Sequence, residues 1–187
     1  MPSADPPSVS ALSDLLVSKS SQTGHAALYE TLALQIQYSL QYQHDWTALT
    51  VHTLSPLSGK PLPRPLISGL PPHRVYVHPD DQVEELKKGV KDGEVEVERE
   101  WVLPTNLKEK WSLKKFAEIF DAIGEQPPRI EKENGTSANE DTEEAVTEQI
   151  KSKKRRGGKR LLLATASDDS TVVYYIVHDG IVKPRQN

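Results

Sequence analysis

The side chains that could carry out chemistry are few in this sequence, and their spacing favours structural roles. His178 and Asp179 form a His–Asp pair on paper, but adjacent strand residues point to opposite sides, and Asp followed by Gly is typical of a turn. Asp80 with the run Glu85 to Lys87 resembles the Asp and Glu-x-Lys residues that hold Mg²⁺ in some nucleases. These groups lie too close together, in a predicted helix. We therefore predict no catalytic residue, no metal site and no cofactor.

The composition restricts the possible partners and compartments. The formal net charge is −4, which argues against binding nucleic acid over a wide surface, so any RNA contact has to be local. The sequence has no cysteine, which excludes disulfides and thiolate metal sites and fits a reducing compartment. No stretch approaches the ~20 apolar residues of a membrane span. We expect a protein of the nucleus or cytosol with no membrane span.

The first half of the chain predicts one long helix, one strand and one proline-rich segment. Apolar residues recurring every four positions predict a helix from Thr23 to about His44. The segment from Trp46 to Thr53 is predicted as a strand. Residues 55–72 contain too many prolines for a helix or an interior strand. We expect an extended wrap there, with a possible edge segment at Leu66 and Ile67.

The middle of the chain predicts two short strands and two helices. Val75 to Val77 is expected to form a short strand, followed by a helix capped by Asp80. Residues 95–103 predict a half-exposed strand whose glutamates, Glu96, Glu98 and Glu100, face solvent. Ser112 is expected to cap a helix that Gly124 ends. Residues 125–158 change from acidic to basic with few apolar side chains, so we predict a disordered insertion.

The last part of the chain predicts a β-hairpin that is apolar on both faces. Leu161 to Ala164 and Val172 to Val177 are the strands, and residues 167–170 have the composition of a turn. Such strands have to be covered on both faces, by helices or by another chain. Little sequence follows the hairpin to cover it. We therefore expect its outer surface to bind a partner.

Three long runs make the family recognisable: "YQHDWTALTVHTLSPLSGKPLPRPLISGLP" (42–71), "REWVLPTNLKEKWSLKKFAEIFDAI" (99–123) and "DDSTVVYYIVHDGIVKPRQN" (168–187). They resemble the Sen-fifteen subunit of fungal tRNA-splicing endonucleases, over residues 28–123 and 159–187. The resemblance implies an α/β (α+β) domain, a small mixed sheet with helices packed on it, like the C-terminal half of archaeal splicing endonucleases. We expect a disordered N-terminus (1–22) and one endonuclease-like domain (23–187) that contains the insertion.

The resemblance also implies a function and a set of contact residues. It implies a non-catalytic, structural subunit of a heterotetramer that removes introns from precursor tRNA, working with catalytic and structural subunits. An acidic loop would enter a basic cleft on a neighbouring subunit, and the last strand region would pair subunits side by side. The residues expected to bind the partner are Asp168, Asp169, Ser170, Val173, Tyr174, Tyr175, Ile181 and Val182. Possible RNA contacts are Lys183 and Arg185.

The catalytic subunits of this family use a Tyr/His/Lys triad, and this chain departs from it. Lys159 stands where the catalytic lysine would lie, but no histidine-containing, glycine-rich segment precedes it. Without a general base, a lone lysine cannot promote attack by the ribose 2′-hydroxyl. We interpret Lys159 as a relic or a structural charge. We expect the chain in the nucleus, with the cytosolic face of an organelle as the alternative.

Two alternatives to the structural subunit stay open. The exposed last strand could make the chain a free-standing homodimeric RNA-binding module. The Asp80 and Glu-x-Lys pattern leaves a metal-dependent nuclease as a weaker option. Asp168 and Asp169 could also belong to an ordinary hairpin turn, since Asp and Ser are favoured there, and a turn can also be an inserted loop.

Overall fold

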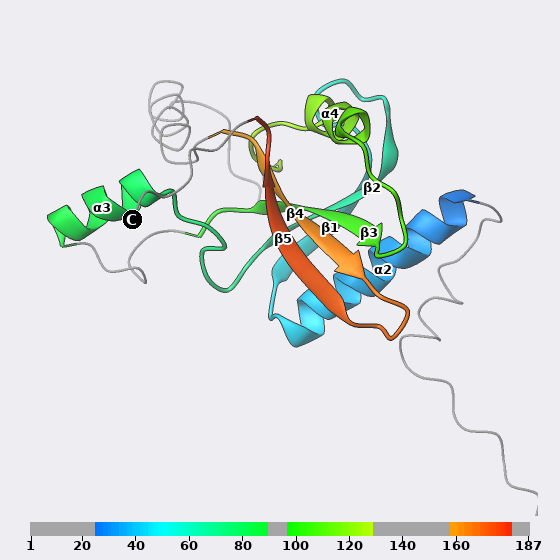
Figure 1. The fold of residues 1–187 in the computed structure, drawn as a ribbon, viewed down its shortest axis with the longest axis horizontal. Coiled ribbons are helices and arrows are strands. Elements are labelled where there is room, and N and C mark those ends of the chain that lie inside the picture. The colour runs from blue at the N-terminus through cyan, green and yellow to red at the C-terminus, as the bar shows by residue number, and fades with distance from the viewer. Residues whose placement is uncertain (1–24, 90–96, 129–157, 181–187) are drawn as a thin grey trace, which may run out of the picture.

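The computed structural model describes residues 25–89, 97–128 and 158–180, which form a five-stranded mixed sheet with helices packed on it (Figure 1). The strand order is β1-β2-β3-β4-β5, and only the pairing of β3 with β4 is parallel. The predicted α+β class is confirmed. The elements in chain order are α2 (His25–Gln43), β1 (Thr47–Leu54), β2 (Pro61–Leu70), α3 (Pro79–Lys88), β3 (Glu100–Asn106), α4 (Leu113–Ala122), β4 (Arg160–Ala166) and β5 (Val172–His178).

Helix α2 covers one face of the sheet with its apolar stripe. Ala33, Ile36 and Leu40 follow each other at helical spacing and are almost fully buried. They pack against Val102 of β3 and Leu162 of β4, in a cluster that includes residues of all five strands. The helix predicted from the four-residue repeat is confirmed. Its proposed cap, Thr23, lies outside the described residues.

Helix α4 covers the opposite face, and its beginning agrees with the prediction. The Ser112 side chain accepts a hydrogen bond from the backbone N–H of Lys115 at 3.3 Å, which makes it the N-cap. Ile119 and Phe120 turn inward against Trp101, which is fully buried. Neighbouring strand residues point to opposite faces of a sheet. Trp101 therefore packs in the cluster under α4, and Val102 packs in the cluster under α2.

The prediction of an extended wrap over residues 55–72 was wrong, because most of this segment is the interior strand β2. Its prolines at 61, 63 and 65 precede the residues that pair with β3, which are Ile67, Ser68 and Gly69. Proline has no backbone N–H, so it removes a hydrogen bond between strands only at a position whose nitrogen would have to donate to the neighbouring strand. Here the prolines occupy the part of β2 that β3 does not reach.

The acidic strand face predicted around residues 96–100 was also wrong where the structure describes it. Glu100 is 2% exposed, and its carboxylate binds the guanidinium of Arg160, the neighbouring residue of β4. Glu98 also reaches Arg160, at 3.9 Å. A buried carboxylate is tolerable only with such a partner. The alternating glutamates predicted that Glu100 faces solvent, whereas in the fold its carboxylate is buried in an ion pair with Arg160.

Two smaller expectations in the middle of the chain need correction. Val75 to Val77 form no strand; Val75 packs on the core under α2 instead. The N-cap of α3 is His78 rather than Asp80, because the His78 Nδ1 accepts the backbone N–H of Asp80 at 3.3 Å. Pro79 then takes the first helical position, where its missing N–H is not needed.

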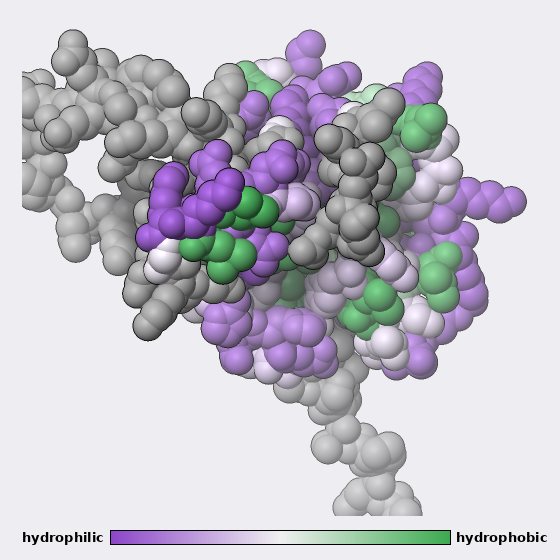
Figure 2. Space-filling model, turned by 60° about the vertical axis from the view of Figure 1, so that its left-hand side comes forward, coloured by the Kyte–Doolittle hydropathy of each residue, from purple (hydrophilic) through white to green (hydrophobic). Residues whose placement is uncertain are grey.

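Helix α3 stands apart from the sheet and keeps its apolar side chains exposed. Arg74 binds the Glu85 carboxylate with both terminal nitrogens, at 2.8 and 3.0 Å, and so ties the helix to the body. Val83 and Leu86 are 49% and 70% exposed. Figure 2 faces this side of the molecule and shows small hydrophobic patches separated by hydrophilic surface. In the described part of the chain, no helix is both long and apolar enough to cross a bilayer.

Candidate assembly surface

Strand β5 forms one edge of the sheet, and it pairs with β4 along its whole length. Every residue from Val172 to His178 has a partner in β4, from Ala166 to Arg160, with no break in the register. Within the part of the chain that the structure describes, no strand lies on its other side. An edge of this kind exposes a row of backbone donors and acceptors to which another strand can pair.

The two faces of β5 differ in how well they are covered. Tyr174 turns toward α2, where its hydroxyl lies 3.1 Å from Ser39 Oγ and its ring meets His44 edge-on. Burial raises the pKa of the Tyr174 hydroxyl. On the other face, Val173 is 45% and Tyr175 57% exposed. Of the two tyrosines predicted to bind a partner, the structure therefore leaves Tyr175 accessible and packs Tyr174 into the fold.

The turn between β4 and β5 is held by its own backbone. Ser167 N–H donates to the Thr171 carbonyl at 2.9 Å, and Ser170 adopts a left-handed backbone with φ of 67°. The Asp169 carboxylate accepts the Thr171 N–H at 3.0 Å. The hydrogen bonds from Thr171 hold the pKa of Asp169 below its usual value. The turn is thus preorganised, and Asp169 stays ionised at neutral pH.

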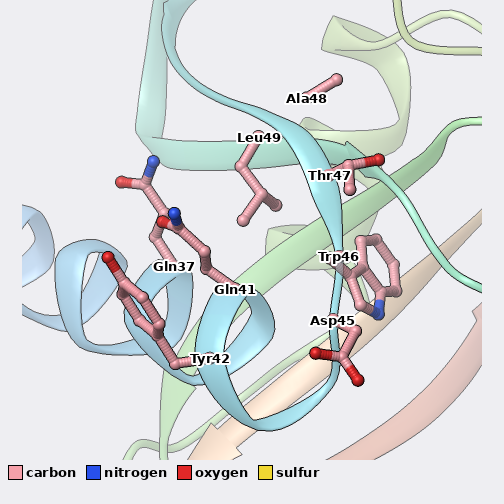
Figure 3. Close-up of a pocket in the computed structure, with 8 residues that line it drawn as sticks. All are labelled: Gln37, Gln41, Tyr42, Asp45, Trp46, Thr47, Ala48 and Leu49. Atoms are coloured by element: carbon pink, nitrogen blue, oxygen red, sulfur yellow. The ribbon is translucent and has the colours of Figure 1, made fainter.

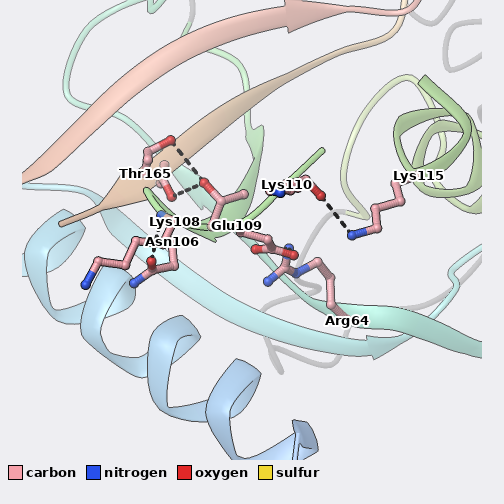
Figure 4. A network of polar contacts seen from close by, with 9 residues as sticks. Arg64, Asn106, Lys108, Glu109, Lys110, Lys115 and Thr165 are labelled. Atoms are coloured by element: carbon pink, nitrogen blue, oxygen red, sulfur yellow. Dashed lines mark hydrogen bonds and ion pairs between the residues drawn. The ribbon is translucent and has the colours of Figure 1, made fainter. Parts of the chain in front are cut away.

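Asp168 projects from this turn and forms an ion pair with Lys108, which follows the end of β3. Both side chains are largely exposed, so the pair contributes little to stability. The backbone of Lys108 is held in place by Asn106, because the Lys108 backbone N–H donates to Asn106 Oδ1 at 2.9 Å (Figure 4). Sequence reasoning missed Lys108; only the parallel pairing of β3 with β4 brings it beside the turn.

The charged residues at the other end of the hairpin do not converge on one point. The Lys159 ammonium donates to the Phe120 carbonyl at 2.9 Å, near the C-terminal end of α4, where a cation is favoured. Arg160, the next residue, points to the other face and binds Glu100. His178 lies beside Arg160, with its ring edge-on to Tyr76 at 4.9 Å. Because Lys159 and His178 serve opposite faces, they cannot act on one reacting atom.

His178 is nevertheless electrostatically perturbed. Burial, Arg160 and His78 lower its pKa, while Glu100 opposes them. Its Nδ1 is buried with no hydrogen-bond partner among the described residues. A neutral imidazole accommodates this position without a counter-ion. The side chain therefore packs as a neutral group at the end of β5.

A shallow pocket lies at the opposite edge of the sheet, between the end of α2 and the start of β1 (Figure 3). Its volume is about 590 Å³. Asp45 is the only carboxylate among its lining residues, and none of them is a histidine or lysine, so the lining offers no acid–base pair. The lining residues are Gln37, Gln41, Tyr42, Asp45, Trp46, Thr47, Ala48 and Leu49.

Several predicted site residues cannot be placed. Ile181 and Val182, as well as the possible RNA contacts Lys183 and Arg185, lie outside the described residues. Most of the predicted disordered segments, 1–22 and 125–158, do so too. Across the described ranges, no group of three or more His, Cys, Asp or Glu side chains is arranged to hold a metal ion.

The fold and this surface define a small α+β domain that leaves one regular sheet edge open beside an acidic turn. Comparison with known families assigns it further. The family model described as Sen15 protein matches residues 35–135 and 132–187, and the chain belongs to this family. The resemblance inferred from the three sequence runs is confirmed.

A curated relative supports the same assignment. The chain is 47% identical, over 161 residues, to the "Probable tRNA-splicing endonuclease subunit tsp-1" of Neurospora crassa. The match covers 84% of this chain and 66% of the relative. The aligned part of the chain therefore spans just under two thirds of that protein's length.

Proposed function

We propose that this chain is a non-catalytic, structural subunit of the tRNA-splicing endonuclease, which removes introns from precursor tRNA. Family membership and the printed name of the Neurospora relative support this choice of complex. The separation of Lys159 from His178 on opposite faces of the sheet supports a role without catalysis. Location in the nucleus, or on the cytosolic face of an organelle, stays a prediction.

The proposed mode of assembly is the addition of a catalytic subunit at the β5 edge. The observation that carries it is the exposure of Val173 and Tyr175 on an uninterrupted edge strand. A partner strand placed there would satisfy the outward backbone groups and remove both side chains from water. Tyrosine is also enriched at protein interfaces, where one end of its ring is apolar and the other polar.

The acidic turn would add direction to this contact. Asp168 and Asp169 lie in the turn just before the start of β5, so they can reach a basic cleft on a neighbouring subunit. Charge-assisted hydrogen bonds there would offset the loss of hydration. Lys108 would have to release Asp168, which costs little because that ion pair is exposed.

The test is co-expression with the catalytic subunits, followed by native mass measurement of the complex. Replacing Asp168→Lys and Asp169→Lys should reduce the fraction of assembled complex, with the folding of the isolated chain unchanged. The matched control is Asp80→Lys with Glu84→Lys on α3, which makes the same charge change at two exposed carboxylates. If the turn variant assembles as well as the control, the contact through the turn is refuted.

The same exposed edge also supports the alternative of a free-standing homodimeric RNA-binding module. Two copies of β5 could pair with each other in the absence of another partner. Sedimentation of the isolated chain, with and without an equimolar catalytic subunit, separates the cases. A homodimer that persists unchanged in the mixture would favour the alternative, and its replacement by a mixed complex would favour the subunit.

A further inference from the structure

The segment from the end of β3 to the start of α4 concentrates positive charge on a chain that is negative overall. It reads NLKEKWSLKK and carries four lysines and one glutamate, against a net charge of −4 for the whole sequence. Lys110, Lys114 and Lys115 are exposed. They flank the N-terminus of α4, where the helix dipole adds further positive potential.

A buried arginine lies beneath this segment and neutralises its one glutamate. Arg64 of β2 is 6% exposed, and its Nη1 donates to both Glu109 carboxylate oxygens at 2.9 Å (Figure 4). Its guanidinium lies between two aromatic rings, 4.3 Å from the centroid of Tyr29 and 5.1 Å from that of Trp111. These contacts fix the plane of the guanidinium.

The second edge of this guanidinium has no partner. Glu109 engages Nη1 only, and no acceptor among the described residues contacts Nε or Nη2, both of which are buried. The indole Nε1 of Trp111 is buried without a partner as well. A buried donor without an acceptor is unfavourable, because it has lost its hydration. A ligand that brings an acceptor to these donors removes this penalty.

We propose that this basic site, made of Arg64, Lys110, Trp111, Lys114 and Lys115, binds the phosphodiester backbone of RNA. The Nε and Nη2 edge of an arginine has the spacing for two oxygens of one phosphate. The lysines supply the surrounding charge without reading sequence. The choice of RNA as ligand rests on the proposed function; the site itself rests on the unpaired donors and the local charge.

Because these donors are buried, neighbouring side chains have to move before a phosphate can reach them. Lys115 lies over the Trp111 ring at 5.8 Å and donates to the Lys110 carbonyl at 3.0 Å. Its exposed side chain can rotate away from the Trp111 ring at the cost of these two contacts, since lysine is flexible. The site lies near α4, whereas α3 lies at another end of the molecule (Figure 1). Lysines on α3 therefore provide a matched control.

The first experiment titrates the full-length isolated chain into a fluorescein-labelled precursor tRNA, followed by anisotropy at several KCl concentrations. Lys110→Gln with Lys114→Gln should weaken binding about tenfold and lower the salt slope by about 2, one for each lost phosphate contact. Lys87→Gln with Lys88→Gln on α3 removes the same charge and should leave both quantities unchanged. Equal effects from the two pairs would overturn the site.

A charge-preserving variant tests the arginine itself. Arg64→Lys keeps the positive charge but loses the bidentate edge, so we expect weaker binding with an unchanged salt slope. Independently of this variant, the Trp111 indole N–H resonance, assigned with Trp111→Phe, should shift on adding the RNA. The indole signals of the buried Trp46 and Trp101 should not shift. A stationary Trp111 signal at saturating RNA would overturn the proposal.

Two further measurements distinguish RNA binding from binding of an acidic protein and from a role in assembly. Poly-glutamate should compete poorly with the RNA; competition at equal charge concentration would assign the site to acidic proteins instead. The Lys110→Gln, Lys114→Gln chain should still assemble with the catalytic subunits, because β5 is untouched. Loss of RNA binding with normal assembly supports the RNA site, and normal RNA binding with lost assembly contradicts it while leaving the proposed function standing.

Discussion

The two edge strands of this sheet, β1 and β5, are protected to very different degrees. β1 has register shifts at both ends, and Asp45 and Ala48 adopt left-handed backbone conformations with φ of 56° and 49°. β5 pairs with β4 without interruption and exposes Val173 and Tyr175. Irregularity blunts an edge against pairing with another chain, and regularity invites it.

This difference favours the β5 side of the sheet for the proposed partner. Ala48 has a positive φ, and an alanine in that region is strained by about 1–2 kcal/mol. The bulge at β1 therefore lowers stability, but it also hinders another strand from pairing with this edge. β5 has no such irregularity. The predictions below test this contrast, beginning with the largest effect.

Acidic substitutions on β5 should abolish assembly. Val173→Asp with Tyr175→Asp would place two charges where a partner has to bury apolar side chains, each worth about 1.5–3 kcal/mol. We expect an affinity loss of about 100-fold or more for the catalytic subunit, measured by native mass titration. Thr47→Asp with Thr53→Asp makes the same charge change at exposed positions of β1 and should assemble normally. Equal losses in both variants would remove the distinction between the edges.

Crowding beneath β1 should affect stability rather than assembly. A methyl group added at Gly69 would lie 2.6 Å from the Leu49 side chain and 2.9 Å from that of Trp46, closer than non-bonded carbons approach. Gly69→Ala should lower the free energy of unfolding by about 1–3 kcal/mol in urea titrations. Gly59→Ala meets no atom within 4 Å and controls for the loss of a glycine, although its own positive φ adds some strain. An unchanged Gly69→Ala protein would show that β1 is not tightly packed.

Relief of the strained residue should stabilise the β1 edge slightly. Ala48→Gly removes the penalty of a left-handed alanine and should raise the free energy of unfolding by about 0.5–1 kcal/mol. Thr47→Gly, one residue earlier and without a positive φ, should be destabilising. If both glycines destabilise the protein, the bulge carries no strain.

The smallest expected effect is on the dependence of stability on pH, with one histidine at each edge. Burial and nearby Arg99 lower the pKa of His52 on β1, and burial with Arg160 lowers that of His178 on β5. Below about pH 6.5 the unfolded chain binds protons that the folded chain resists, so stability falls as pH falls. Thermal unfolding between pH 7.5 and 5.5 should show a smaller loss in His52→Gln and in His178→Gln. A loss as large as in the unmodified protein would contradict the lowered pKa.

Local patterns predicted those elements whose sequence signals agreed with their surroundings. The helical repeat of α2, the Ser112 cap of α4 and the turn at residues 167–170 were all readable, because propensity, capping and burial pointed the same way. β2 was missed because prolines normally exclude an interior strand. They are tolerated here because β3 pairs only with the part of β2 that follows them, which the local sequence does not reveal. Glu100 was misplaced because its partner, Arg160, lies 60 positions away in the sequence.

The candidate surface was predicted only in part for the same reason. The sequence indicated an apolar last strand with an acidic turn, and both are present. It could not decide which tyrosine faces outward, because this depends on Ser39 in α2 and on His44, just after the helix. Nor could it find Arg64, whose unpaired donors arise from the meeting of β2, α2 and the segment before α4.

Hydrogen exchange of the assembled complex tests whether a partner strand pairs with β5. We predict that amides of Val172–His178 exchange more slowly when the catalytic subunit is bound, because a partner strand pairs with them. Amides of Thr47–Leu54 should exchange as in the isolated chain. Unchanged exchange in β5, or protection of β1 instead, would contradict assembly through the β5 edge.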